Sequence, residues 1–250
     1  MQRKLLTDRV WEIDFLRGTA VILMLFSNFA TDVAYFRIYP VDVYSGFWLY
    51  LARIIVSMFI LVSGMSLTLS YYRMKNKKPA EIRKKYFFRG ARIFGLGILI
   101  TIVTSIFIRD FVAFGVLHLI GFSVFFGQFL AGRKRECLIL GISFLLTGIF
   151  LQGIRFGFPW LLWLGFIPEG YSSVDYVPVF PWFGFFLIGM FLGNVFYPDG
   201  NRRFNVRDFS GKIFIKPVSF LGRNSLKIYL IHQPLLILFL RLSFPYNFPF

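Results

Sequence analysis

Residues 15–36 read FLRGTAVILMLFSNFATDVAYF. Crossing the hydrocarbon core of a membrane takes roughly 20 helical residues, and this stretch is apolar for that length. It is too long for the apolar core of a cleavable signal peptide, and the DFLRG start at residues 14–18 does not read as a leader. We therefore expect a membrane-spanning helix that stays in the mature protein.

Six further apolar stretches follow the first. They lie at residues 46–72, 90–108, 111–131, 137–153, 181–197 and 224–242. The 250-residue chain is 57% hydrophobic and 21% aromatic, far more than soluble proteins are, so a soluble globule is excluded. The pattern predicts an all-α membrane bundle of about seven transmembrane helices, with residues 1–250 forming a single domain.

The basic residues are distributed unevenly between the loops. Of the 28 Lys and Arg residues, all but five fall in segments on one side of the predicted membrane. The five exceptions are Arg37, Arg53, Arg109, Arg155 and Arg241. Because basic loops resist translocation, we expect a multi-pass protein of the cell membrane with a cytoplasmic N-terminus and an extracytoplasmic C-terminus. The net charge of +16 then reports topology, and no nucleic-acid partner is expected.

One aromatic segment affects this count of spans. Residues 156–167 are apolar, but the segment is only about half as long as a span must be. Trp160 and Trp163 suit the headgroup region, so we expect an interfacial or re-entrant piece. The loop at residues 154–180 is then the longest extracytoplasmic feature and a candidate lid over an outward-facing site.

Signatures of several other protein classes are missing from the sequence. Cys137 is the single cysteine, which excludes an internal disulfide and a cysteine-rich metal site. There is no Walker loop, no dinucleotide glycine fingerprint, no Gly-x-Ser-x-Gly elbow and no metal-ligand spacing. We therefore expect no metal cofactor.

Polar residues within the predicted spans are the candidate functional residues, because ionisable groups in a membrane are costly and usually face the bundle interior. At about 100° per residue, Asp14, Arg17, Asn28 and Asp32 form one stripe along the first helix. The alternative interpretation is that this stripe only joins neighbouring helices through hydrogen bonds.

Polar groups on four spans reach similar depths. Counted from the outer boundary at about 1.5 Å per residue, Asp32 lies roughly 6 Å deep, Arg53 and His118 about 10 Å, Asn28 about 12 Å and His232 about 16 Å. A structural ion pair between Asp32 and Arg53 fits this as well as a catalytic role does. Each histidine either exchanges a proton near neutral pH or is a neutral ring bonded between helices.

Basic residues near the cytoplasmic ends of the helices are candidate ligands for an anionic nucleotide. The set comprises Arg17, Lys85, Arg89, Arg92, Arg223 and Lys227. Topology alone also explains these residues, and so does binding to the anionic lipids of the inner leaflet. Membrane lipids are expected partners in either case.

Short motifs along the chain are similar to those of a known family. They are EIDFLRG (12–18) followed by Asn28, FILVSG (59–64), GVLH (115–118), DYVP (175–178) with PWFG (181–184), and IYLIHQP (228–234). In this order they resemble the heparan-alpha-glucosaminide N-acetyltransferase catalytic-domain family, and more distantly the acyltransferase-3 and YeiB-type membrane proteins. The resemblance covers nearly the whole chain.

The resemblance implies a transmembrane acyltransferase. Such a protein moves an acyl group, here acetyl or another acyl, from cytoplasmic acyl-CoA to an amine or hydroxyl of an extracytoplasmic sugar or glycolipid-type acceptor. Asn28 matches the family's first-helix asparagine and Arg17 its helix-start arginine. The family's proposed active histidine follows that asparagine, but residues 36–45 contain no histidine, which excludes an acyl-histidine there.

Acyl transfer needs a general base and donors for the developing oxyanion. We hypothesise that His118 is the base, oriented by Asp32, and that Asn28 and Arg53 are donors. His232 is a second candidate base or positions the thioester. A small transporter or flippase and a non-enzymatic scaffold remain alternatives, since both also have polar spans and basic loops. Pairing with a second copy of the chain as a homodimer is left open.

Overall fold

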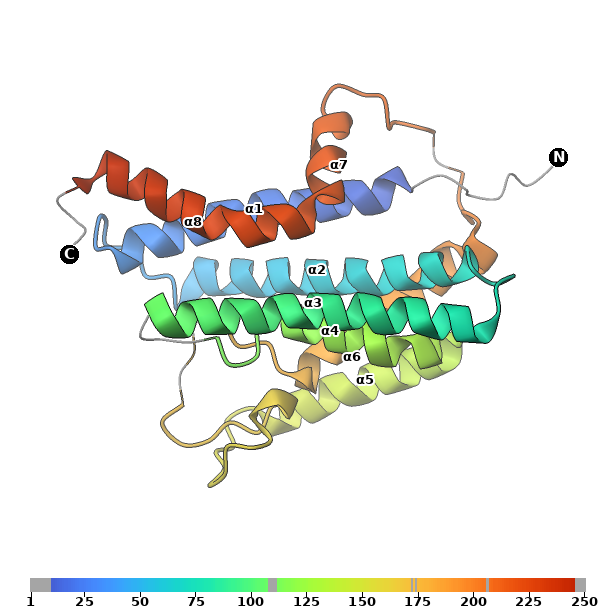
Figure 1. Cartoon of the computed structure of the whole chain (residues 1–250), viewed down its shortest axis with the longest axis horizontal. Helices are drawn as coiled ribbons and strands as arrows, with labels where there is room; N and C mark the ends of the chain where they lie inside the picture. The colour runs from blue at the N-terminus through green and yellow to red at the C-terminus, as the bar shows by residue number, and fades with distance from the viewer. Residues whose placement is uncertain (1–9, 108–111, 172, 174, 206, 246–250) are drawn as a thin grey trace. The chain divides into compact units, whose positions relative to one another are not determined.

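The computed structural model describes residues 10–107, 112–171, 173, 175–205 and 207–245 (Figure 1). The elements in this part are α1 (Trp11–Tyr35), α2 (Gly46–Tyr72), α3 (Pro79–Phe107), α4 (Val116–Gly127), η1 (Gln128–Leu130), α5 (Lys134–Leu151), η2 (Leu162–Leu164), α6 (Val179–Phe196), η3 (Pro198–Gly200), α7 (Ile215–Arg223) and α8 (Ser225–Ser243). Every one of them is a helix, and extended residues pair only in two isolated bridges within the same ranges. The predicted all-α class is confirmed.

Five of the described helices are long and apolar enough to cross a membrane, namely α1, α2, α3, α6 and α8. Four of these begin at or within about one helical turn of the predicted bounds. The stretches predicted at 111–131 and 137–153 correspond to a shorter apolar helix, Val116–Leu130, and to α5, whose first turn is charged. Seven spans and a cytoplasmic N-terminus therefore stay predictions.

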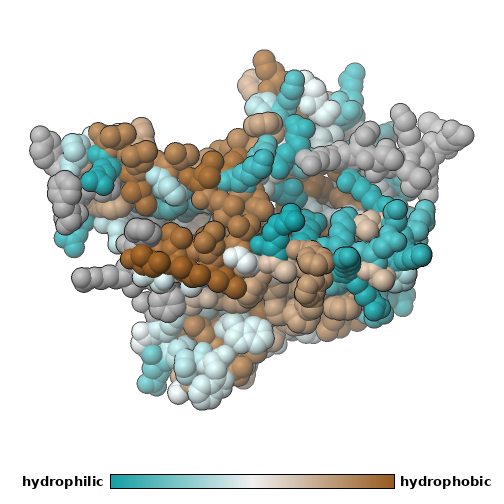
Figure 2. All heavy atoms as spheres, in the orientation of Figure 1, coloured by the Kyte–Doolittle hydropathy of each residue, from teal (hydrophilic) through white to brown (hydrophobic). Residues whose placement is uncertain are grey.

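Helix α3 begins about three turns before the predicted start at residue 90. Pro79 fits a first helical position, where no N–H is needed, and Glu81 interacts favourably with the helix dipole. Figure 2 shows hydrophilic side chains toward the Pro79 end of α3 and hydrophobic ones toward its Phe107 end. Hydropathy detected only the apolar end of this helix.

The described residues form two compact units. The central unit comprises Ile60–Asn205, and the terminal unit lies within Asp8–Phe59 and Val206–Phe250. Helix α2 contributes residues to both units. Asn28, Asp32, Arg53 and His232 therefore belong to the terminal unit, and His118 belongs to the central unit.

In the terminal unit, α1 packs against α7 and α8. Two glycines permit the approach of α1 and α7. Gly18 faces the Val218 carbonyl and Gly222 faces the Asp14 carbonyl, so closely that a Cβ on either glycine would overlap with the backbone. This is the close contact through small residues that membrane helices use.

In the central unit, α3 packs on α4 and α5 packs on α6. Hydrogen bonds join α2 to α6 within this unit: Tyr72 donates to Asn194 Oδ1 (2.6 Å) and Thr68 donates to the Met190 carbonyl (3.2 Å). Lys75, beyond the end of α2, pairs with Asp199 at 3.1 Å, and this carboxylate raises the pKa of Lys75.

Candidate functional site

The terminal unit holds a hydrogen bond between two residues that the sequence singled out. Asn28 Nδ2 on α1 lies 2.7 Å from His232 Nε2 on α8. His232 is 7% exposed, and its Nδ1 lies 2.7 Å from the carbonyl oxygen of Tyr229, one turn earlier in the same helix. The imidazole is therefore held at both nitrogens.

These two contacts define the proton position in a neutral His232. A carbonyl oxygen can only accept, so Nδ1 must carry the proton that is donated to Tyr229. Nε2 then has the lone pair, and it accepts from the side-chain amide of Asn28. The result is an oriented base nitrogen whose resting partner is a neutral donor.

A second contact lies one turn further along α1. Gln233 Nε2 donates to Asp32 Oδ1 at 2.6 Å. Asp32 is 6% exposed, and its other carboxylate oxygen is buried without a hydrogen-bond partner among the described residues. Adjacent residues of α8 thus bind residues four apart on α1, which fixes the register of the two helices.

Arg53 was predicted as a partner of Asp32 or as an oxyanion donor. Its side chain is exposed on α2. Among the described residues, the hydrogen-bond partner of the Asp32 carboxylate is the side-chain amide of Gln233 instead. The roles predicted for Arg53 and Asp32 in catalysis stay predictions.

His118, in the central unit, is packed at the start of α4. The Gly115 N–H donates to its Nδ1 at 3.2 Å, which caps the first turn of the helix. The ring is 5% exposed, stacks on Phe114 and meets the edge of Phe94. Gly97 on α3 leaves room for the ring, since a Cβ there would lie 3.0 Å from it. These contacts favour the structural interpretation of His118 over the general-base interpretation.

The loop predicted as a lid is tied to the same start of α4. Val177 N–H donates to the Phe114 carbonyl (2.8 Å), and Asp175 accepts from the Val116 N–H (3.4 Å). Tyr176 donates to the Leu162 carbonyl at 2.7 Å, and burial raises the pKa of this phenol. Before α6 begins at Val179, the described part of the loop has only the short helix η2, and its predicted function as a lid stays a prediction.

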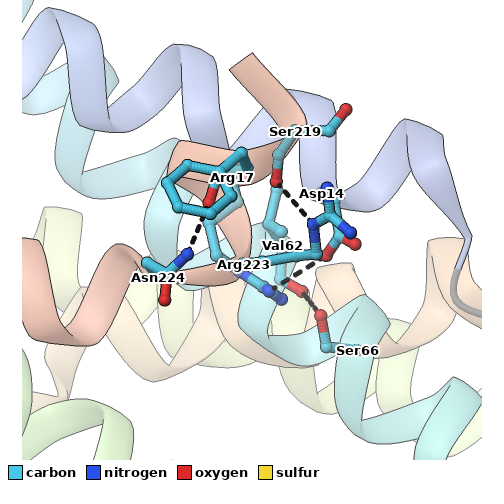
Figure 3. Close-up of polar contacts among 8 residues, drawn as sticks. Asp14, Arg17, Val62, Ser66, Ser219, Arg223 and Asn224 are labelled. Carbon is cyan, nitrogen blue, oxygen red and sulfur yellow. Dashed lines mark hydrogen bonds and ion pairs between the residues drawn. The ribbon is translucent and has the colours of Figure 1, made fainter. Parts of the chain in front are cut away.

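A pocket of about 350 Å³ lies at the cytoplasmic end predicted for α1, beside α7. Its lining includes Asp14, Ser219 and Arg223. Figure 3 shows the contacts: Arg17 pairs with Asp14 at 3.6 Å, and Arg223 Nε donates to the Ser219 carbonyl at 3.4 Å. The predicted stripe along α1 is therefore divided between two places, the pocket and the Asn28–Asp32 contacts with α8.

The predicted nucleotide ligands are divided between the two units. Lys227 and Arg223 have exposed side chains at the start of α8 and the end of α7. In the central unit Arg89 and Arg92 are exposed on α3, and Lys85 donates to Ser70 Oγ at 3.2 Å. Binding of a nucleotide by these residues stays a prediction.

Sequence reasoning missed Gln233, Trp11 and Ser219. Gln233 follows His232 within a predicted span. A side-chain amide in a span needs a partner on a neighbouring helix, so the sequence position of Gln233 could have identified it as a contact residue. Ser219 and Trp11 come together only because α7 folds back on the start of α1, and hydropathy gave no sign of α7.

A comparison with protein-family models agrees with the family resemblance that the short sequence motifs indicated. The family model described as heparan-alpha-glucosaminide N-acetyltransferase, catalytic, matches residues 9–234. No curated protein and no solved structure gives a significant match.

Proposed function

Since the chain belongs to the heparan-alpha-glucosaminide N-acetyltransferase catalytic family, we propose that it is an acyl-CoA-dependent acyltransferase embedded in the cell membrane. The donor is acetyl-CoA or another acyl-CoA that enters from the cytoplasm. The acceptor is an amine or hydroxyl of an extracytoplasmic sugar or glycolipid. The observation that carries this proposal is the contact of Asn28 with His232 Nε2, in a ring whose Nδ1 is held by the Tyr229 carbonyl.

His232 has the proton arrangement that a general base requires. An acceptor hydroxyl or amine replaces the Asn28 amide at Nε2 and gives up its proton there, as its oxygen or nitrogen bonds the acyl carbon. The Asn28 amide, released from the ring, then donates to the oxyanion. When the carbon–sulfur bond breaks, the imidazolium returns the proton to the sulfur of CoA.

Asp32 and the basic residues have supporting parts in this proposal. Asp32 holds Gln233, and so fixes the segment of α8 that carries His232. The phosphates of the donor meet basic residues of the terminal unit, Lys227 near the start of α8 and Arg17 near the start of α1.

The two histidines can be tested as a matched pair. Glutamine keeps a hydrogen-bond acceptor but cannot take up a proton from the substrate near neutral pH. We therefore compare His232→Gln with His118→Gln. The purified chain in nanodiscs is given acetyl-CoA and glucosamine as probe acceptor, and free thiol and acetylated sugar are measured. We expect H232Q to lose at least about 100-fold in turnover, the usual contribution of a general base, and H118Q to keep most of it.

Two results would contradict the proposal. Wild-type turnover in H232Q together with loss of turnover in H118Q would identify His118, and not His232, as the general base. If acetyl-CoA gives neither turnover nor a higher melting temperature, the chain is no acyltransferase, because a bound donor must stabilise the folded state.

A further inference from the structure

The pocket beside α7 has a chemistry that acyl transfer does not use. It lies within the terminal unit and is lined by Trp11, Ser219, Lys216 and Arg223, among others. Ser219 Oγ and Trp11 Nε1 are buried donors without a hydrogen-bond partner among the described residues. Ser219 is only 6% exposed, and leaving a donor unpaired at such burial costs about 1–3 kcal/mol. An acceptor placed in the pocket would remove this cost.

The other charges of the pocket indicate that the acceptor is an anion. Lys216 and Arg223 supply groups that can only donate. Asp14 also lines the pocket, but the Arg17 guanidinium lies 3.6 Å from its carboxylate and offsets its charge. Two neutral donors and two cations around one cavity match a phosphate group.

The surroundings of the pocket indicate where the phosphate comes from. Ile213, Phe214 and Phe220 are 80%, 83% and 59% exposed. Only Asn224 separates α7 from α8, which is long and apolar enough to span a membrane, so α7 lies at the membrane boundary. Exposed apolar side chains next to cations are typical of short helices in the headgroup region. A soluble nucleotide would leave these apolar side chains unexplained.

We propose that this pocket binds the phosphate of an anionic phospholipid from the adjacent leaflet. Ser219 and Trp11 donate hydrogen bonds to the phosphate, and Lys216 and Arg223 neutralise it. Arg223 thus serves the lipid rather than the acyl-CoA donor. The bound lipid holds α7 against the start of α1, whether or not the chain transfers acyl groups.

The test compares two neighbouring lysines and one hydroxyl. Lys216 lines the pocket, whereas Lys212 packs over the Phe209 ring at 4.4 Å and does not line it. Full-length wild type, Lys216→Gln, Lys212→Gln and Ser219→Ala are placed in phosphatidylcholine nanodiscs. Melting temperature is then followed as phosphatidylglycerol replaces part of the phosphatidylcholine, which gives an apparent lipid affinity.

We expect phosphatidylglycerol to raise the melting temperature of the wild type. Lys216→Gln should weaken its apparent affinity about fivefold, the contribution of one basic residue at a membrane surface. Ser219→Ala, which changes no charge, should weaken it about tenfold, since a hydrogen bond to a charged group is lost. Lys212→Gln should change it less than about twofold, because that charge acts only through the screened surface potential.

Three results would overturn the proposal. The first is an equal loss in K212Q and K216Q, which would show general surface attraction. The second is an unchanged affinity in S219A. The third is found in neutral detergent without lipid: stabilisation by coenzyme A that both K216Q and S219A abolish would assign the pocket to the donor. Because Lys216 is exposed, K216Q removes no core packing. Its apparent lipid affinity therefore tests the proposal even if S219A does not fold.

Discussion

At the residue scale, the amide of Asn28 has two successive partners in the proposed reaction, first His232 Nε2 and then the oxyanion. Asn28→Leu keeps a similar side-chain volume and removes both. We expect turnover to fall about 100-fold, the usual cost of losing one oxyanion donor. Thr31→Val is the matched control on α1, because among the described residues the Thr31 hydroxyl bonds only the Ser27 carbonyl of its own helix. Equal turnover in the Asn28→Leu and wild-type proteins would remove Asn28 from the mechanism.

The contact between Gln233 and Asp32 predicts a non-additive effect on stability. Gln233→Leu leaves the buried Asp32 carboxylate without its hydrogen-bond donor, at an expected cost of about 1–3 kcal/mol in the free energy of unfolding. Adding Asp32→Leu removes the orphaned group and should recover most of that loss. Unfolding in mild detergent measures both variants. Additive losses would show that the two residues are not coupled.

The sequence predicted the residues that are costly to bury better than it predicted their partners. Asn28, Asp32 and His232 were predictable, because polarity within an apolar span is visible in the sequence alone. The partner of His118 was not predictable. The contact with the Gly115 N–H arises because α4 begins at Val116, whereas hydropathy extended that stretch back to residue 111.

At the element scale, two glycines determine how closely α1 and α7 approach. In Gly18→Ala and Gly222→Ala the new Cβ would meet backbone carbonyls, which cannot rotate away as a side chain can. We expect each to lower the free energy of unfolding by about 1–3 kcal/mol, the usual cost of overpacking. Gly95→Ala on α3 is the control, because nothing lies within 4 Å of its added Cβ, and helix propensity should make it neutral or stabilising. Equal melting temperatures for all three variants would contradict this packing.

Hydropathy located the long apolar helices because a span must be continuous and apolar, and α2 has the predicted bounds. It failed where charge and apolar surface share one helix. The basic first turns of α3 fell outside the predicted span, and α7 was indicated only as part of a basic loop. The helix bounds at such places depend on caps and on tertiary contacts, and the mean hydropathy of a stretch of sequence carries no information about either.

At the scale of the whole molecule, the sequence predicts sidedness through the distribution of Lys and Arg. The number of crossings depends on short segments for which length and charge conflict. Helix α5 shows this conflict, since Arg135 and Glu136 occupy the first turn of an otherwise apolar helix.

Cysteine labelling in intact cells can measure the sidedness directly. Cys137 is the single native cysteine and is buried, so background labelling should be low. Asp42, Lys77, Gly157 and Asn205 are exposed loop positions for single substitutions to cysteine. With seven crossings and a cytoplasmic N-terminus, Asp42→Cys and Gly157→Cys should react with a membrane-impermeant thiol reagent. Lys77→Cys and Asn205→Cys should react only after permeabilisation.

The position at Asn205 distinguishes the two interpretations of the aromatic segment 156–167. If that segment crossed the membrane, the following basic loop would move outside and Asn205→Cys would react in intact cells. The loop carries several arginines and lysines, and short loops with many basic residues rarely lie on the outer face of a membrane. We therefore expect Asn205→Cys to stay protected. Reaction in intact cells, with Lys77→Cys still protected, would overturn the count of seven and place α7 and its pocket on the outer face.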